Sequence, residues 1–171
     1  MEKPTQIVDL LVEDLRFPTS LALDGSDASH PDPDYSAVYV TLVTDLPEYK
    51  GFGIGFTLGR GNEIVMHCVD SLRFLVIGKS IQVRKKLKEK KAKIFIHYLQ
   101  DVTGNMGDWI RSLAHDGQLR WIGPEKGAIH LAVGAIVNAF WDLWGKIEGK
   151  PVWKLLVDMT PEEIVSLVDF R

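Results

Sequence analysis

Apolar and polar positions alternate imperfectly in Gln6–Leu15 and clearly in Gly51–Leu58, and this period of two predicts a β-strand on either side of a third at Ala37–Thr44. The middle segment is β-branched or aromatic almost throughout, as strands prefer. Pro18 ends the first strand, and the segment Thr19–Asp34 is rich in Asp, Gly, Ser and Pro, which predicts a long loop. Strands that follow one another in this way favour an antiparallel meander.

The third strand has two unlike faces. Its apolar side chains Phe52, Ile54, Phe56 and Leu58 share one face, whereas the other face carries only glycines at its first three positions. A glycine face in a strand indicates that another part of the protein approaches the backbone closely.

Beyond residue 61 the apolar spacing changes to three and four, which predicts helices. We expect Asn62 to cap a first helix, whose buried stripe is Ile64, Cys68, Leu72, Leu75 and Val76. A second helix is expected over Asp108–Ala114. The third and longest begins at Pro124, ends at Gly149, and has its stripe at Ile129, Val133, Ile136, Phe140, Leu143 and Ile147.

Two further elements are expected near the C-terminus. Pro151–Val157 reads as a short helix, and Thr160–Glu163 combines a capping threonine, a first-turn proline and two acids. The apolar run Ile164–Phe170 then predicts a strand. The fold class is therefore α+β, a three-stranded antiparallel meander followed by a helical bundle.

Length and composition exclude several classes of protein. A chain of 171 residues is too short for a complete eight-stranded α/β barrel, which needs about 250. The single cysteine, Cys68, rules out an intrachain disulfide. The apolar stretch Ala128–Leu143 is interrupted by polar residues, so a membrane span is not expected. The first residues lack the features of a targeting segment, and we expect an intracellular location, cytoplasmic or mitochondrial.

The charge is unevenly distributed. The whole chain has a net charge of −3, yet Lys79–Lys93 contains eight Lys or Arg and one acid. Such a run could bind nucleic acid, but a solvated surface explains it more simply, and nucleic acid is not our expected partner.

The run Ala135–Leu156 contains small residues along a helix, then Asp-Leu-x-Gly-Lys at Asp142–Lys146, then Pro-Val-x-x-Leu-Leu. This pattern resembles the mandelate racemase and muconate lactonising branch of the enolase superfamily. Asp14–Ser20, Gly25–Ala28 and Asp116–Gly127 narrow the resemblance to L-fuconate dehydratase-like members. It extends from about residue 6 to Arg171, except for a basic insertion at 82–100.

The resemblance implies a capping domain over residues 1–160, with 161–171 as the start of a truncated barrel and only its first strand. Family members use Mg²⁺ to stabilise an enediolate after a base removes the proton next to a carboxylate. Their bases and metal ligands lie on later barrel strands. We therefore expect no catalytic or metal-binding residue in this chain, an inactive fragment, a sugar-acid substrate for the complete enzyme, and a homo-oligomer.

In this family two loops of the capping domain reach over the barrel mouth, and they correspond here to Thr19–Tyr35 and Phe56–Asn62. The resemblance implies substrate contacts from Gly25, Ser26, Asp27 and Tyr35. The residues by themselves leave another interpretation open, in which Gly25 and Asp27 only form a turn and Tyr35 packs at the start of its strand.

The remaining polar residues carry weaker signals. His67, His97, His115 and His130 have no partner at metal-ligand spacing. Asp142 and Lys146 stand four residues apart on one helix, where an ion pair explains them better than catalysis. The rival function is a non-catalytic interaction or nucleic-acid-binding module derived from the capping domain.

Overall fold

The structure of the chain is a computed structural model that describes residues 4–81, 101–123 and 127–168. The basic insertion at 82–100 and Pro124 lie outside the described residues, as does any role of the insertion in binding nucleic acid. The elements in chain order are β1 (Thr5–Arg16), η1 (Thr19–Leu21), β2 (Ser36–Thr44), β3 (Lys50–Thr57), α1 (Asn62–Leu72), η2 (Arg73–Leu75), β4 (Ser80–Ile81), α4 (Met106–Ala114), η3 (Arg120–Ile122), α5 (Ala128–Glu148), α6 (Val152–Val157) and α7 (Pro161–Ser166).

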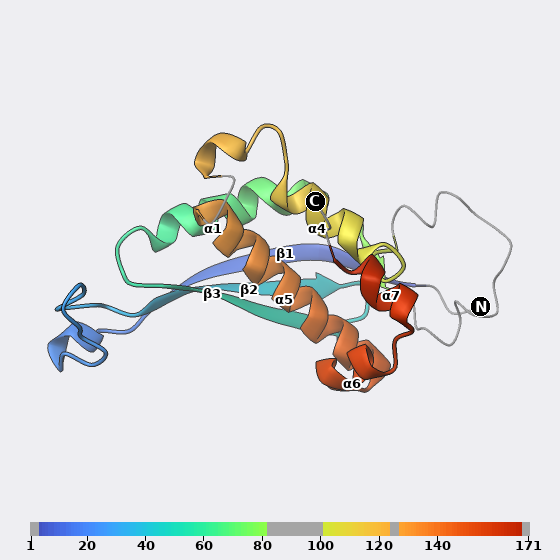
Figure 1. Cartoon of the computed structure of the whole chain (residues 1–171), viewed down its shortest axis with the longest axis horizontal. Helices are drawn as coiled ribbons and strands as arrows, with labels where there is room; N and C mark the ends of the chain where they lie inside the picture. The colour runs from blue at the N-terminus through green and yellow to red at the C-terminus, as the bar shows by residue number, and fades with distance from the viewer. Residues whose placement is uncertain (1–3, 82–100, 124–126, 169–171) are drawn as a thin grey trace, which may run out of the picture.

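The strands form one antiparallel sheet in the order β3-β2-β1-β4 (Figure 1). The meander predicted from the sequence is confirmed, because β1 pairs with β2 and β2 pairs with β3. The short strand β4 was not predicted, since two residues carry no readable period. It pairs with the first residues of β1 and makes the sheet four-stranded.

Helix α5 packs on the glycine face of β3, as the pattern of that strand predicted. A methyl group added to Gly53 would lie 2.0 Å from the carbonyl oxygen of Ala135, and one added to Gly51 would lie 2.1 Å from that of Ala139. Only glycine therefore allows the helix backbone to come this close. The inward side chains of the neighbouring strand, Val38, Val40 and Leu42, are fully buried in the same layer.

The opposite face of the sheet is open among the described residues. Phe52, Ile54 and Phe56 are 39%, 51% and 55% exposed, because the helices cover the other face. Two ring contacts organise this outer face, since Tyr39 stacks on Phe52 and Tyr35 meets Phe56 edge to face.

The long helix α5 is the centre of the core. Its predicted stripe is confirmed at Ile129, Val133, Ile136, Phe140 and Leu143, which are buried, whereas Ile147 is only partly buried. The helix begins at Ala128, after Gly127 at its N-cap, and not at Pro124 as predicted. The predicted end is confirmed too, because Gly149 adopts a left-handed conformation with φ of 64° and closes the helix. The helix is long and apolar enough to cross a membrane, yet 56% of that stretch is buried inside the protein, as in the core helix of a globular domain.

The capping role predicted for Asn62 is wrong. Gly61 occupies the N-cap of α1 and no side chain caps this end, because the Asn62 amide bonds to groups on β1, β2 and β3 instead. The stripe also shifts by one residue at its start. Val65 is buried where Ile64 was expected, and Ile64 is 55% exposed.

The prediction of a strand over Ile164–Phe170 is also wrong for the residues that the structure describes. Residues 164–166 belong to α7, residues 167 and 168 form no strand, and the last residues lie outside the described part. Thr160 makes a capping box with Glu163 and Pro161 starts the helix, so the local signals favour helix. A parallel barrel strand needs neighbouring strands, and none of the described strands lies beside this segment.

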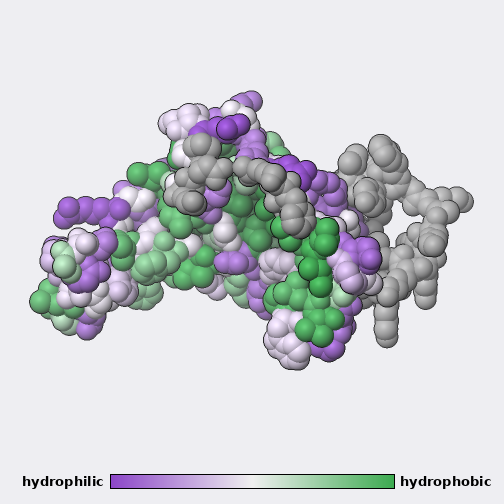
Figure 2. Space-filling model, viewed as in Figure 1, coloured by the Kyte–Doolittle hydropathy of each residue, from purple (hydrophilic) through white to green (hydrophobic). Residues whose placement is uncertain are grey.

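The two ends of the sheet differ in character. The loop between η1 and β2 projects from one end, and the helices α6 and α7 lie at the other (Figure 1). These helices expose Trp153, Val157 and Val165, each more than half exposed. A hydrophobic area extends toward α6 in Figure 2.

Candidate functional site

One threonine, Thr19, joins the two ends of the loop between β1 and β2 through hydrogen bonds. The Thr19 hydroxyl donates to the Pro33 carbonyl over 2.7 Å and accepts the Tyr35 amide over 2.9 Å. Next to it, the Asp34 carboxylate accepts both the amide and the hydroxyl of Ser20. These bonds hold the pKa of Asp34 below its ordinary value, with the Ser20 hydroxyl as the largest cause. The loop therefore leaves the sheet as a tied unit.

Gly25 and Tyr35, two of the predicted substrate-contact residues, lie against each other. The Tyr35 hydroxyl donates to the Gly25 carbonyl over 3.4 Å, and a methyl group on Gly25 would collide with that hydroxyl at 1.8 Å. Gly25 also has a φ of 73°, a backbone conformation that residues with a side chain rarely adopt. Both residues thus shape the loop tip.

Ser26 and Asp27 follow at the exposed tip of the loop. The Asp27 carboxylate accepts the amides of Ser29 and His30 through its Oδ1 atom, at 2.7 and 2.8 Å. These bonds, that from His30 first, keep the pKa of Asp27 below its ordinary value, so the carboxylate stays ionised. The turn-forming interpretation of Gly25 and Asp27 therefore has support from the contacts.

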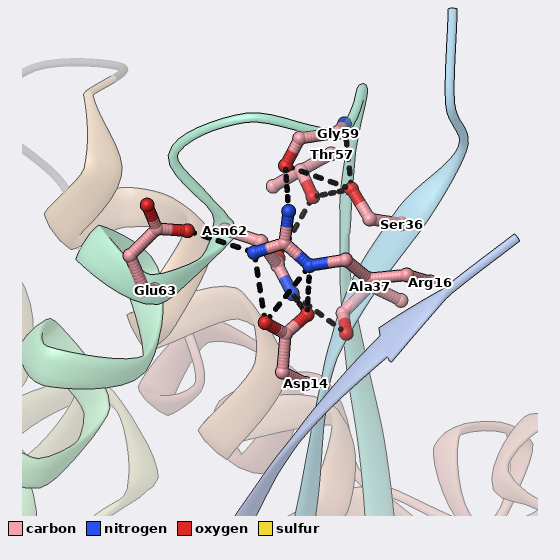
Figure 3. A network of polar contacts seen from close by, with 8 residues as sticks. All are labelled: Asp14, Arg16, Ser36, Ala37, Thr57, Gly59, Asn62 and Glu63. Carbon is pink, nitrogen blue, oxygen red and sulfur yellow. Dashed lines mark hydrogen bonds and ion pairs between the residues drawn. The ribbon is translucent and has the colours of Figure 1, made fainter. Parts of the chain in front are cut away.

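The second loop expected to cover the barrel mouth, Phe56–Asn62, is anchored by a polar network that the sequence did not reveal (Figure 3). Arg16, at the end of β1, is its centre. Its guanidinium grips the Asp14 carboxylate with bonds of 2.8–3.0 Å, reaches Glu63 over 2.8 Å, and donates to the Gly59 carbonyl over 3.2 Å. One side chain thus joins β1, the loop after β3 and the start of α1.

Asn62 lies beneath this arginine and is completely buried. Its amide nitrogen donates to the Asp14 carboxylate and to the Ala37 carbonyl, and its oxygen accepts the Thr57 hydroxyl. The Ser36 hydroxyl bonds to Thr57 over 2.6 Å and accepts the amide of Gly59 over 2.7 Å (Figure 3).

The network combines one cation, Arg16, with two carboxylates, Asp14 and Glu63. Hydrogen bonds from Arg16 and then Asn62 lower the pKa of Asp14, and the same carboxylate raises the pKa of Arg16. Both groups are therefore ionised at any physiological pH. Because all three guanidinium nitrogens of Arg16 donate within the network, we assign this side chain the role of positioning the loop.

A cavity of about 580 Å³ lies between the two loops. Its walls are Arg16, Phe17, Pro18, Ser20, Ser29, His30, Pro31, Asp32, Pro33, Asp34, Leu58, Gly59 and Arg60. The structure thus brings together the two loops that the sequence singled out. None of Gly25, Ser26, Asp27 and Tyr35 lines this cavity, although their loop does.

The cavity has the chemistry of a recognition site for a small polar molecule. Arg60 and His30 supply hydrogen-bond donors, Asp32 supplies acceptors, and Phe17 and Leu58 supply apolar contact. Sequence reasoning missed Arg60 and His30, because only the fold places their loops together. Among the described residues no group of three or more His, Cys, Asp or Glu could hold a metal ion.

Comparison with known proteins gives a consistent result. No family model matches the chain. Human mitochondrial enolase superfamily member 1 is 51% identical over 97% of this chain, and L-galactonate dehydratase from Hypocrea jecorina is 49% identical over 92%. The chain spans about a third of the length of these curated relatives.

Solved structures agree in fold. The crystal structure of human mitochondrial enolase superfamily member 1 superimposes with a TM-score of 0.83, at 50% identity, over 98% of this chain and 34% of that one. L-Talarate dehydratase from Polaromonas, in complex with Mg and L-glucarate, gives 0.60 at 15% identity over 91% of this chain and 33% of that one, which shows the fold alone.

Proposed function

Since this chain belongs to the enolase superfamily and corresponds to its N-terminal capping domain, we propose that it selects the substrate of a sugar-acid dehydratase. The observation that carries this proposal is the cavity between the two loops, which are the loops that cover the barrel mouth in the family. The relative named L-galactonate dehydratase supports the class of reaction. The complete protein would remove water from a small sugar acid after a proton is abstracted next to the carboxylate.

The metal-dependent step belongs to another part of such an enzyme. The described residues do not fit a magnesium site, because no three or more of their His, Cys, Asp or Glu side chains form a group that could hold a metal ion. This chain would contribute binding, orientation and the exclusion of water, and by itself it would be inactive. Formation of a 2-keto-3-deoxy product from L-fuconate and Mg²⁺ by the purified chain would contradict this part of the proposal.

The preferred substrate is L-fuconate, by the resemblance of the loop residues, and L-galactonate is the alternative that the fungal relative brings. The two acids differ only at carbon 6, which bears no hydroxyl in L-fuconate. A capping loop that touches the distal end of the substrate is the part that would distinguish them. The apolar walls Phe17 and Leu58 favour the methyl group of L-fuconate.

Two sets of residues would contact the substrate. Gly25, Ser26, Asp27 and Tyr35 remain proposed contacts at the tip of the first loop. Arg60 is a proposed contact on the second loop, where its charge acts on Asp34 across the cavity. Arg16 also lines the cavity, but we assign it to positioning the second loop because the polar network engages its guanidinium.

A chimera tests the proposal. This chain would replace the matching third of the Hypocrea jecorina L-galactonate dehydratase, and kcat/KM would be measured for both acids. We expect the ratio to shift toward L-fuconate. We expect Arg60→Ala to lower kcat/KM by about 10- to 100-fold, mainly through KM, as the loss of a charged hydrogen bond implies.

The matched control is Arg111→Ala. Arg111 is also an exposed arginine, but it pairs with Asp108 on α4. It should leave both kcat/KM values within about twofold, since an exposed pair of this kind contributes little. An active chimera that retains the parent's ratio and tolerates Arg60→Ala would refute substrate selection by this domain.

We propose a mitochondrial location. The curated vertebrate relatives are named as mitochondrial proteins, which favours the mitochondrion over the cytoplasm.

A further inference from the structure

The Asp-Leu-x-Gly-Lys motif at Asp142–Lys146 has no role in the proposed recognition site. It lies on α5, beside the outer strand of the sheet. The predicted ion pair is present, because the Lys146 ammonium bonds to the Asp142 carboxylate. An exposed pair four residues apart on a helix adds little stability by itself. The position of this pair points to a second purpose.

Among the described strands β3 lies at an edge of the sheet, since it pairs with β2 alone. In an antiparallel edge strand every second residue turns its amide and its carbonyl away from the sheet. The Phe52 amide bonds to Asp142 and not to β2, which places Lys50, Phe52, Ile54 and Phe56 in the outward set. Such a row of backbone groups is a template for pairing with another chain.

The ion pair occupies part of this template. The Asp142 carboxylate accepts the Phe52 amide over 2.8 Å, and the Lys146 ammonium donates to the Lys50 carbonyl over 3.0 Å. The carboxylate and the ammonium thus supply one acceptor and one donor to the edge of β3. A neighbouring strand would supply the same two functions with a carbonyl and an amide. The Lys146 ammonium also lies 4.2 Å from the centre of the Phe52 ring, which holds it above the strand.

The other edge of the sheet is protected by different means. Strand β4 covers the first residues of β1, and an irregularity in the pairing follows between Ile7 and Asp9. Asp9 then pairs with Arg73 of η2. Short covering strands, bulges and charges are the usual protections of an edge. In the described residues β3 has the ion pair in their place.

We propose that the Asp142–Lys146 pair is a side-chain substitute for a neighbouring strand, which blocks pairing of β3 with the β3 strand of a second copy. Two features make a second copy the expected partner. Antiparallel pairing of β3 with itself satisfies the same outward groups on both chains. The exposed Phe52, Ile54 and Phe56 of the two strands would also extend one apolar face across the joint.

The test compares the full chain with its variants Asp142→Ala and Asp142→Ala/Lys146→Ala. Hydrogen exchange followed by NMR would report on the Phe52 amide, with the Leu42 amide in the central strand as internal reference. At a concentration at which sedimentation shows a monomeric variant, we expect Asp142→Ala to accelerate exchange at Phe52 by at least about tenfold relative to Leu42, because the bond to a charged acceptor is lost. Equal acceleration of both amides, or none, would overturn the proposal.

Sedimentation velocity measures the second consequence. The double variant should show a larger mean mass than the parent at equal concentration, with an increased infrared signal of intermolecular β-structure. The matched control is Lys154→Ala, which breaks an ion pair of the same spacing between Lys154 of α6 and Asp158, the residue that follows this helix. A double variant with the parent's mass would refute edge blocking.

A conservative variant covers the case in which the alanine variants fail to fold. Lys146→Met keeps the aliphatic stem over Phe52 and removes the donor to Lys50. It should increase the mean mass less than the double variant but more than Lys154→Ala. A folded Lys146→Met with the mass of that control would refute the role of the lysine.

Discussion

The close packing of α5 on β3 makes a sharp prediction about Gly53. In Gly53→Ala the added methyl group would lie 2.0 Å from the Ala135 carbonyl oxygen and 2.6 Å from the Ala139 nitrogen. Ordinary contact begins at 3.4 Å, so the first distance is about 1.4 Å too short. Both obstacles are backbone atoms of a helix, which cannot rotate away as a side chain can. The helix must therefore separate from the strand.

The expected cost follows from what overpacked cores show. Forcing an extra carbon into a packed interior costs about 1–3 kcal/mol, and more where the backbone must move. We take about 3 kcal/mol for Gly53→Ala, because separation would also loosen the contacts of Gly51 with the same helix. For a protein of this size that corresponds to a fall in Tm of about 6–12 °C.

The assay is urea denaturation, followed by circular dichroism, together with thermal melting. The control is Gly134→Ala, the same substitution on the exposed side of α5, where the methyl group meets nothing within 4 Å. It should stabilise the protein by about 1 kcal/mol, since alanine is the better helix former. Gly55→Ala, with its nearest contact at 3.1 Å, should fall between the two. A Gly53→Ala protein as stable as the parent would refute the packing argument.

Three further predictions concern the polar groups. Asn62→Ala should lower the free energy of unfolding by about 2–3 kcal/mol in urea titrations, because it removes the partner of a buried carbonyl and of a hydroxyl, and a wild-type value would contradict the role given to the network. The depressed pKa values of Asp27 and Asp34 mean that their contribution to loop order is complete above the ordinary value of 3.8 and lost as pH falls through the lower folded values. Amide exchange in the loop should therefore accelerate relative to the sheet only below about pH 4, and a transition near pH 6 would show that other groups hold the loop. Burial raises the pKa of the Cys68 thiol, so a thiol reagent at pH 8 should react slowly with the native protein and rapidly in denaturant, and equal rates would place the thiol at the surface.

The sequence by itself determined the elements whose signals are local. The period of two located β1 and β3, the β-branched and aromatic residues located β2, and the spacing of three and four located α5 with its end at Gly149. The glycine face of β3 also predicted that another element packs closely on this strand, and that element is α5. Each of these features is decided within a few neighbouring residues, and a sequence displays such neighbours directly.

Tertiary structure decided the roles that depend on distant residues. Asn62 had the position of a helix cap, yet it bonds to Asp14, which is 48 residues away in the chain. Asp142 had the spacing of a simple ion pair, yet it also accepts an amide 90 residues away. In the same way, Arg60 and His30 line one cavity only because the fold brings their two loops together.

The segment after Thr160 shows why a sequence displays local features directly but does not display contacts between distant residues. Its apolar run fits a strand by composition, but a strand exists only when another strand bonds to it, and the described residues place none beside it. The capping box and the proline act on their own neighbours and start α7. Helices draw their hydrogen bonds from within the segment, whereas strands, buried amides and clefts need partners that only the folded chain supplies.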